Sequence, residues 1–179
     1  SSDVCSSDLG KVKKGKFKIG DNVTAKIDSY KRQLIKCNHS STHLLHASLR
    51  KILGNHVSQK GSLVNSEKLR FDFSHNEPIT SDNIIKIENF VKKEITANSK
   101  IEIKTIDHQK ALDEGATALF GEKYGDEVRV VSMGTVENNK IFSKELCGGT
   151  HVDQTGDILN FKIIKDRKST RLNSSHSSV

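Results

Sequence analysis

Two short motifs that lie far apart in the sequence constrain this chain more than any other feature. His39 and His43 are separated by three residues at the start of an amphipathic segment, and Cys147 and His151 are separated by Gly148-Gly149-Thr150. On a helix, the first spacing places both side chains on one face, with Cβ atoms about 6 Å apart. Zinc takes four nitrogen and thiolate ligands in a tetrahedron. A fold that joins the two pairs would therefore complete one zinc site.

Each pair also has an ordinary interpretation, because isolated His-x-x-x-His and Cys-x-x-x-His spacings are weak metal signals. His46 lies three residues after His43 on the same side of the expected helix, so it is a rival ligand. We expect His46 to be a helix-face histidine that is hydrogen-bonded to a neighbour. Cys37, two residues before His39, is expected to be an ordinary half-buried cysteine.

Length, charge and cysteine content limit the number of domains, the kind of partner and the cellular location. The 179 residues suit one domain with a small appendage. Lys and Arg number 29 against 22 Asp and Glu, giving a net charge of +7. That charge suits a polyanionic partner such as RNA, although a lysine-rich solvated surface would give the same value. Three cysteines predict no disulfide framework and favour a reducing cytoplasmic location. No apolar run indicates membrane insertion or secretion.

Apolar periodicity and capping residues predict three helices. The first begins at Asn38 as its N-cap and ends at Gly54. The second follows Thr80, with apolar residues at spacings of three and four. The third follows Asp107 and extends as far as Leu119.

Alternating apolar residues predict the strands. They fall in residues 16–30 (a hairpin of two short strands), 62–73, 101–105, 127–133 and 158–165. Gln59 and Gly61 are expected in a loop before the second of these ranges. Segregated strands and helices indicate an α+β fold, in which helices pack on one face of a mixed or antiparallel sheet.

Five segments resemble alanyl-tRNA synthetases and occur in the same order as in that family. They are NHSSTHLL (38–45), QKGSLV (59–64), LRFDFSH (69–75), ALFGEKYG (118–125) and LCGGTHV (146–152). Together they resemble the family's editing domain, which is related to the editing domain of threonyl-tRNA synthetases and to free-standing alanyl editing proteins. The resemblance covers residues 16–165.

This resemblance implies a division of the chain. Residues 11–31 correspond to the end of a small β-barrel domain and residues 32–165 to a zinc-containing tRNA editing domain. Residues 1–10 and 166–179 match nothing in the family. They are rich in serine and lack periodicity, so we expect them to be appended adaptor or cloning sequence, or disordered.

The resemblance also implies a site and a reaction. His39, His43, Cys147 and His151 match the family's zinc ligands, which predicts one zinc ion per chain. Thr42 and Gln59 match positions implicated in editing; for Thr42, a hydroxyl bonded back to its own helix is the alternative. The implied substrates are Ser-tRNA(Ala) and Gly-tRNA(Ala), whose aminoacyl ester would be hydrolysed.

An editing site answers a physical need, because a pocket for alanine separates it from glycine or serine by only about 1–3 kcal/mol. The expected partners are the acceptor end of tRNA(Ala) and the rest of the synthetase. No ATP-binding motif or ligase active site is visible in this chain, so alanine activation and tRNA charging are expected only of the full-length protein.

Two other functions remain open. One is a free-standing trans-editing aminoacyl-tRNA deacylase, against which the partial barrel and the GEKYG segment argue. The other is a zinc-stabilised tRNA-binding module without catalytic activity. Four protein ligands fill a tetrahedron, as in structural zinc sites, whereas catalytic zinc usually keeps one position open.

Overall fold

The computed structural model describes residues 11–118, 124–137, 140–171 and 174–178. Its elements in chain order are α1 (Ser29–Leu53), β1 (Gln59–Val64), β2 (Leu69–Ser74), α2 (Ser81–Ala97), β3 (Glu102–Asp107), α3 (His108–Asp113), β4 (Glu127–Glu137), β5 (Lys140–Leu146), η1 (Thr155–Ile158), β6 (Arg167–Arg171) and β7 (Ser174–Ser178). The strands form a sheet of order β1-β2-β7-β6 and a sheet of order β3-β4-β5, and all their pairings are antiparallel. The predicted α+β class with an antiparallel sheet is confirmed, although two sheets are present.

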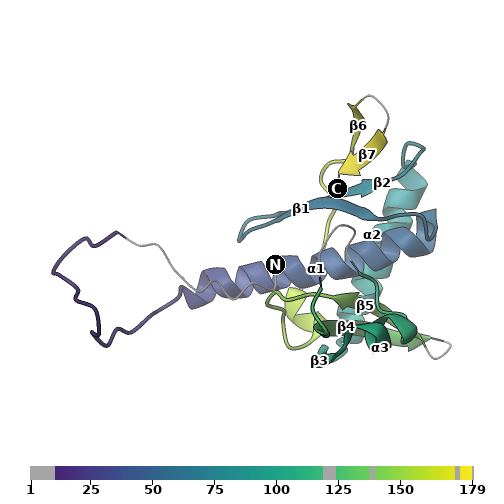
Figure 1. Ribbon diagram of the computed structural model, residues 1–179. Coiled ribbons are helices and arrows are strands. Elements are labelled where there is room, and N and C mark those ends of the chain that lie inside the picture. The colour runs from purple at the N-terminus through teal and green to yellow at the C-terminus, as the bar shows by residue number, and fades with distance from the viewer. Residues whose placement is uncertain (1–10, 119–123, 138–139, 172–173, 179) are drawn as a thin grey trace.

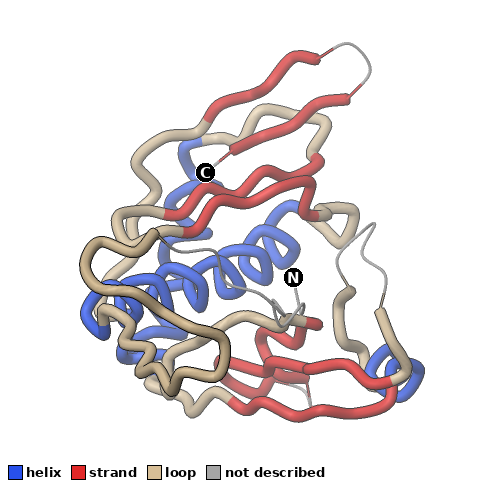
Figure 2. Tube along the Cα trace, turned by 60° about the vertical axis from the view of Figure 1, so that its left-hand side comes forward, coloured by secondary structure: helices blue, strands red, loops and turns tan. Residues whose placement is uncertain are grey.

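The long helix α1 lies between the two sheets, and α2 crosses it from behind (Figures 1 and 2). The main core forms where these layers meet, because each contributes an apolar face. Its completely buried members are Leu44, Leu45, Leu49, Val57, Phe71, Phe73, Ile87, Val91 and Met133. A smaller cluster around Ala111, Val128, Val130 and Leu146 includes residues of α3, β4 and β5.

Helix α1 is longer than predicted. Asp28 is its N-cap and accepts a hydrogen bond from the Lys31 backbone N–H at 2.9 Å. The predicted start at Asn38 is wrong, because residues 29–37 contain no glycine or proline to stop the helix. Asn38 instead lies within the helix, and its amide donates to the Asn65 carbonyl at 2.8 Å. The predicted end at Gly54 is confirmed.

Residues 62–73 form a hairpin where one strand was predicted. Asn65 turns the chain by accepting hydrogen bonds from the backbone N–H groups of Glu67 and Lys68 at 2.8 and 2.9 Å. Gln59 and Gly61 therefore lie in β1, and their predicted place in a loop is wrong.

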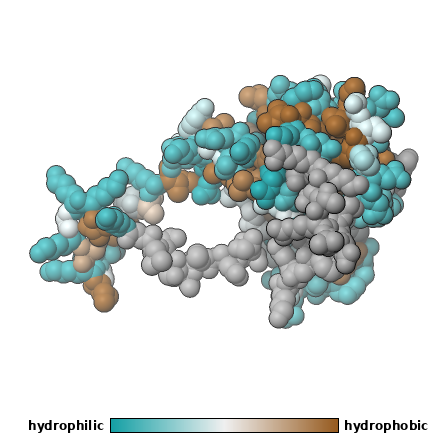
Figure 3. Space-filling view, turned by 90° about the horizontal axis from the view of Figure 1, so that it is seen from above, coloured by the Kyte–Doolittle hydropathy of each residue, from teal (hydrophilic) through white to brown (hydrophobic). Residues whose placement is uncertain are grey.

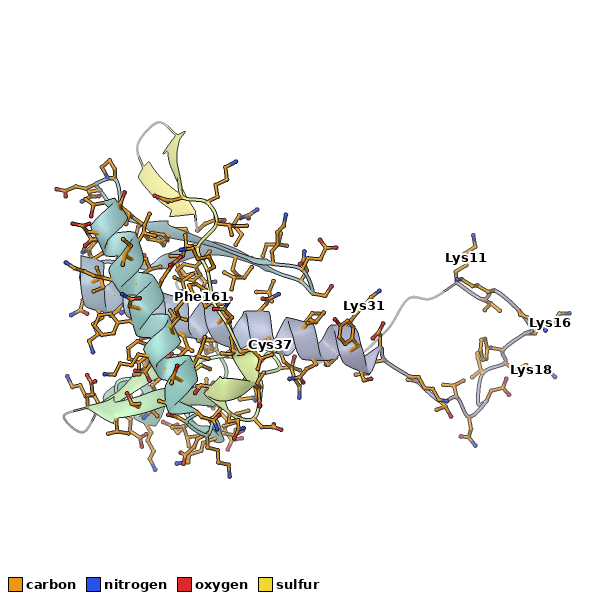
Figure 4. The ribbon with its side chains drawn as sticks, turned by 180° about the vertical axis from the view of Figure 1, so that it is seen from behind. Lys11, Lys16, Lys18, Lys31, Cys37 and Phe161 are labelled. Atoms are coloured by element: carbon orange, nitrogen blue, oxygen red, sulfur yellow. The ribbon has the colours of Figure 1, made fainter. Side chains whose placement is uncertain are left out.

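The strand predicted at residues 158–165 is absent. The chain forms the 3₁₀ helix η1 and then continues without ladder pairing to residue 166. Two polar contacts of this segment go to buried Glu88, which accepts from the Ile163 N–H at 2.8 Å and from Lys162 Nζ at 2.7 Å. Phe161 enters the core beside α2 (Figure 4).

The hairpin predicted at residues 16–30 is also absent. Residues 11–28 contain no strand and leave the body of the molecule as an arm whose apolar side chains are exposed among polar ones (Figure 3). Phe17 is 65% exposed and Ile19 is 108% exposed. A two-stranded hairpin is marginal unless a further strand or a helix covers its apolar face, and none does so here among the described residues.

The structure describes only part of the two terminal segments. Residues 1–10 and Leu119, the predicted end of the third helix, lie outside the described residues. Residues 166–179 were expected to be appended sequence or disordered; in the structure, β6 and β7 form a hairpin and β7 pairs with β2. The reason is that β2 offers unpaired backbone groups along its outer edge, which another strand can satisfy. The appended origin of these residues stays a prediction.

The predicted second helix is confirmed, and the third begins after Asp107 as predicted but ends at Asp113, because residues 114–118 are not helical. Thr80 accepts from the Asn83 N–H at 3.2 Å, and Asp107 accepts from the Lys110 N–H at 2.9 Å. Within the part of the chain that the structure describes, no helix combines the length and apolarity needed to cross a membrane.

Candidate metal centre

The structure brings the four predicted metal ligands together. His39 and His43 come from the middle of α1, whereas Cys147 and His151 come from the loop that follows β5. One ligand atom from each residue lies within 4.8 Å of all the others. His43 and His151 are buried, and His39 and Cys147 are half-buried. This donor set of three imidazoles and one thiol suits zinc.

The imidazole rings are oriented as metal ligands require. Each Nδ1 atom faces an oxygen outside the cluster: Thr150 O at 3.2 Å for His39, Glu145 Oε2 at 2.7 Å for His43 and Ser40 Oγ at 3.3 Å for His151. The Nε2 atoms of His43 and His151 are buried and have no hydrogen-bond partner within the described residues. Buried polar atoms are rarely left unsatisfied. A metal ion at the centre of the cluster would satisfy both atoms, and the outer contacts would fix the rings.

The Cys147 loop is fitted closely to α1. A Cβ atom at Gly149 would overlap the His39 ring, so no other residue fits there without displacing that ring. Arg129 of β4 holds the loop from the other side, because its Nη1 donates to the carbonyls of Cys147 and Gly149 at 2.8 and 2.6 Å. The Gly149 N–H points at the Cys147 sulfur, 3.4 Å away.

The pKa values of two ligands favour their metal-binding forms. Burial raises the pKa of the Cys147 thiol, but the surrounding imidazoles of His151, His39 and His43 favour the thiolate, outweigh burial and lower this pKa to about 3. Burial lowers the pKa of His151 to about 4. At neutral pH, the protein without metal therefore presents a thiolate at Cys147 and a neutral imidazole at His151.

His43 behaves in the opposite way. Burial disfavours its charged form, but the Glu145 carboxylate outweighs burial and raises the pKa of His43 to about 10. The same contact holds the pKa of Glu145 well below its usual range, against the effect of burial. A metal ion that binds at neutral pH must therefore displace a proton from His43.

The two rival residues are not part of the cluster. His46 Nδ1 contacts Glu145 Oε1 at 3.0 Å, which confirms the prediction that His46 is hydrogen-bonded to a neighbour. Cys37 is half-buried, as predicted, and its thiol donates to the Asp157 carbonyl at 3.3 Å (Figure 4). Burial raises the pKa of this thiol, and the nearby Asp157 raises it further.

A pocket of about 240 Å³ adjoins the cluster. Both residues predicted to discriminate substrates, Thr42 and Gln59, line it. The other lining residues are His39, His43, Ser62, Tyr124, Gly125, Glu127, Val128, Arg129, Glu145, Leu146, Cys147, Gly148 and Gly149. The Thr42 hydroxyl donates to the Asn38 carbonyl at 2.9 Å, which is the alternative considered for it, and its lone pairs stay available as acceptors.

Two residues of this site were missed in the sequence. Glu145 lies in β5, a strand that was not predicted, so the sequence offered no reason to place its carboxylate beside α1. Arg129 alternates with the buried Val128 and Val130 in the predicted strand 127–133. That alternation is the signal that could have placed Arg129 on the opposite face from the valines.

Comparisons with known proteins show what this chain is similar to. Residues 128–177 match the family described as "Threonyl and Alanyl tRNA synthetase second additional domain". The alanine–tRNA ligase of Burkholderia multivorans is 50% identical over 157 residues, which cover 88% of this chain and 17% of that protein. Those of Burkholderia lata and Burkholderia vietnamiensis are each 51% identical over 155 residues, which cover 87% of this chain and 17% of the relative. The chain thus spans 17% of the length of the curated relatives it matches.

Proposed function

We propose that this chain, as a segment of an alanyl-tRNA synthetase, is the part of that enzyme that hydrolyses mischarged tRNA. The substrates would be Ser-tRNA(Ala) and Gly-tRNA(Ala), and the bond broken would be the ester between the amino acid and the terminal ribose. The acceptor end of tRNA(Ala) and the remaining domains of the synthetase would be its partners. A reducing cytoplasmic location would keep the Cys147 thiolate available as a ligand.

The observation that carries this proposal is one shared pocket. Thr42 and Gln59 come from α1 and β1, and they line the same cavity as His39, His43 and Cys147. Drug-sized ligands usually occupy 300–1,000 Å³. The cavity of about 240 Å³ suits the aminoacyl end of a tRNA better than an extended ligand.

The residues of the chain have separate parts in this proposal. Because the Thr42 hydroxyl donates to Asn38, it offers its lone pairs to the hydroxyl of a seryl group. Gln59, on β1, would contact the substrate from a different element. Arg129 keeps the Cys147 loop in place at the edge of the pocket. A zinc ion held by the four ligands would supply the polarisation of a carbonyl or the activation of water.

A zinc-stabilised tRNA-binding module is the second candidate. The observation that favours it is the ligand count, because four converging protein ligands leave no open position on tetrahedral zinc. In that case the metal would hold α1 and the Cys147 loop together, and any hydrolysis would depend on other groups or other domains.

Deacylation separates these candidates. The zinc-loaded chain is mixed with seryl-tRNA and with alanyl-tRNA, both prepared on tRNA(Ala), and loss of the ester is followed over time. The proposal predicts rapid loss of the seryl ester while the alanyl ester persists. If neither ester is lost from a folded, zinc-loaded chain, hydrolysis by this segment is rejected and the binding module is favoured.

Thr42→Val tests the contact to serine. One neutral hydrogen bond contributes about 0.5–1.5 kcal/mol, so seryl-tRNA deacylation should slow about 2- to 10-fold. Thr105→Val is the matched control, because Thr105 is exposed on β3 and does not line this pocket. Equal rates for both variants and the unmodified chain would remove Thr42 from the discrimination of serine.

A further inference from the structure

Glu145 is a buried acidic residue directly behind the candidate metal centre. Its side chain is 6% exposed, and its two carboxylate oxygens contact different imidazoles, His43 Nδ1 at 2.7 Å and His46 Nδ1 at 3.0 Å. A buried carboxylate is costly unless it is paired and hydrogen-bonded. The two contacts supply this compensation, and they connect a metal ligand to a residue that is not a ligand.

The backbone holds Glu145 in place on both edges of its strand. In β5 it lies opposite Val131 of β4, and on the other edge it forms a parallel bridge with Thr117. The Thr117 N–H donates to the Lys144 carbonyl at 2.9 Å, and the Leu146 N–H donates to the Thr117 carbonyl at 3.0 Å. The carboxylate is therefore presented to α1 from a fixed position.

The contacts decide which nitrogen of each ring carries the proton. An ionised carboxylate only accepts hydrogen bonds, so His43 and His46 both donate from Nδ1. Their Nε2 atoms are buried without a hydrogen-bond partner among the described residues. Once a metal ion displaces the second proton of His43, the Nε2 lone pair faces the cluster. The His46 ring packs against Phe71, with ring centroids 5.2 Å apart.

We propose that Glu145 is a positioning residue that fixes the metal-binding tautomer of His43, and that His46 is the second donor that holds this carboxylate in place. The inference rests on the proposed metal site, but not on any hydrolytic activity. The charges of the proposed site also balance, because the Cys147 thiolate and the Glu145 carboxylate together neutralise a zinc ion surrounded by neutral imidazoles. An electroneutral cluster avoids the cost of a buried net charge.

The test compares the zinc affinity of variants of the full chain, by competition with a chelator of known affinity. Glu145→Gln keeps the shape of the side chain but offers one acceptor oxygen in place of two, so at least one imidazole loses its acceptor. Removal of such outer-sphere partners typically weakens metal binding about 10- to 100-fold. We expect a loss in this range.

Glu94→Gln is the matched control. Glu94 is 1% exposed and accepts from the Thr135 N–H and hydroxyl at 2.6 and 3.0 Å, but it is not part of the metal cluster. This variant should lose stability and keep its zinc affinity. A purely structural role for Glu145 predicts that the two glutamine variants behave alike, and that result would overturn the proposal.

His46 provides an independent comparison if Glu145→Gln does not fold. The amide nitrogen of Asn can take the place of histidine Nδ1, so His46→Asn should keep near-normal zinc affinity, whereas His46→Ala should weaken it. Visible absorption of the cobalt-substituted protein should show the tetrahedral site disturbed in His46→Ala and restored in His46→Asn. Equal affinity and spectra for the two variants would overturn the proposal. Failure of the unmodified chain to bind zinc or cobalt would reject the metal site itself.

Discussion

At the scale of single residues, the candidate metal centre would depend on two opposite requirements at nearby positions, Cys147 and Gly149. Cys147 must present a thiolate, and the low pKa of about 3 provides one at neutral pH. Gly149 must present no side chain at all, because the His39 ring occupies the space where its Cβ would lie. In the loop after β5, Cys147 is thus required for its thiolate and Gly149 for the absence of a side chain.

Gly149→Ala should therefore weaken zinc binding. The added methyl group must displace the His39 ring or the loop, and a displaced ligand loses its place in the tetrahedron. We expect a loss of affinity about as large as for an outer-sphere change, roughly tenfold or more, as measured by chelator competition. Gly125→Ala is the control, since Gly125 lines the same pocket but no described residue lies within 4 Å of its added Cβ. Normal affinity in Gly149→Ala would show that the loop can move without affecting the site.

The four candidate ligands could be predicted from the sequence, but the residue that contacts His43 from behind, Glu145, could not. The resemblance of NHSSTHLL and LCGGTHV to a known family identified four residues that the fold then brought together. Glu145 could not be found in this way, because its role depends on the pairing of β5 with Thr117 and β4. The roles of Thr42 and Gln59 remain predictions, and the structure places both at the pocket.

At the scale of elements, capping residues and apolar alternation predicted the helices and strands whose structure depends on residues close in the sequence. Thr80 and Asp107 cap their helices, and the alternation at residues 127–133 gave the core of β4. The predicted strands were wrong where contacts with residues distant in the sequence determine the structure. The apolar alternation at residues 16–30 has no covering element among the described residues, and the backbone at residues 158–165 is satisfied partly by the Glu88 side chain.

An ion-pair cluster joins three elements on the surface away from the metal centre. Glu137 at the end of β4 accepts from Lys93 of α2 at 2.8 Å and from Lys51 of α1 at 2.9 Å. The hydrogen bond from Lys93, followed by that from Lys51, lowers the pKa of Glu137 to about 2. A carboxyl whose pKa is lowered by folding stabilises the protein above its ordinary pKa near 4.5 and loses that effect as the pH falls toward 2.

Glu137→Gln should consequently lower stability at pH 6 but not at pH 2. The effect should be small, because the cluster is exposed and screened by salt. Urea unfolding of both proteins at several pH values measures it, and 1 M NaCl should reduce the difference at pH 6. A difference that persists unchanged at pH 2 would mean that the amide disturbs packing and that charge is not the cause.

At the scale of the whole molecule, the candidate metal centre joins the middle of α1 to the segment after β5. These two parts lie far apart in the chain, and the loop also precedes η1 and the core residue Phe161. An ion bound by both parts stabilises only the folded state, since the unfolded chain has no preformed site. Metal binding should therefore be linked to global stability.

Zinc should raise the stability of the chain, and the gain should grow with the logarithm of the free zinc concentration above the dissociation constant. With free zinc at 100 times the dissociation constant, the expected gain in the free energy of unfolding is about 2.7 kcal/mol. Urea denaturation with zinc and with chelator measures this gain. The double variant His39→Ala, Cys147→Ala should show no gain, and a similar gain in both proteins would place the stabilising ion elsewhere.

X-ray absorption at the zinc edge measures the coordination shell that the four proposed ligands would form around zinc. The chain, purified without chelator and containing one zinc ion per molecule, should show one sulfur ligand at about 2.3 Å and three nitrogen ligands at about 2.0–2.1 Å. Cys147→Ala should lose the sulfur contribution, whereas Cys37→Ala should keep it. A shell without sulfur, or a protein without zinc, would contradict a metal centre formed by His39, His43, Cys147 and His151.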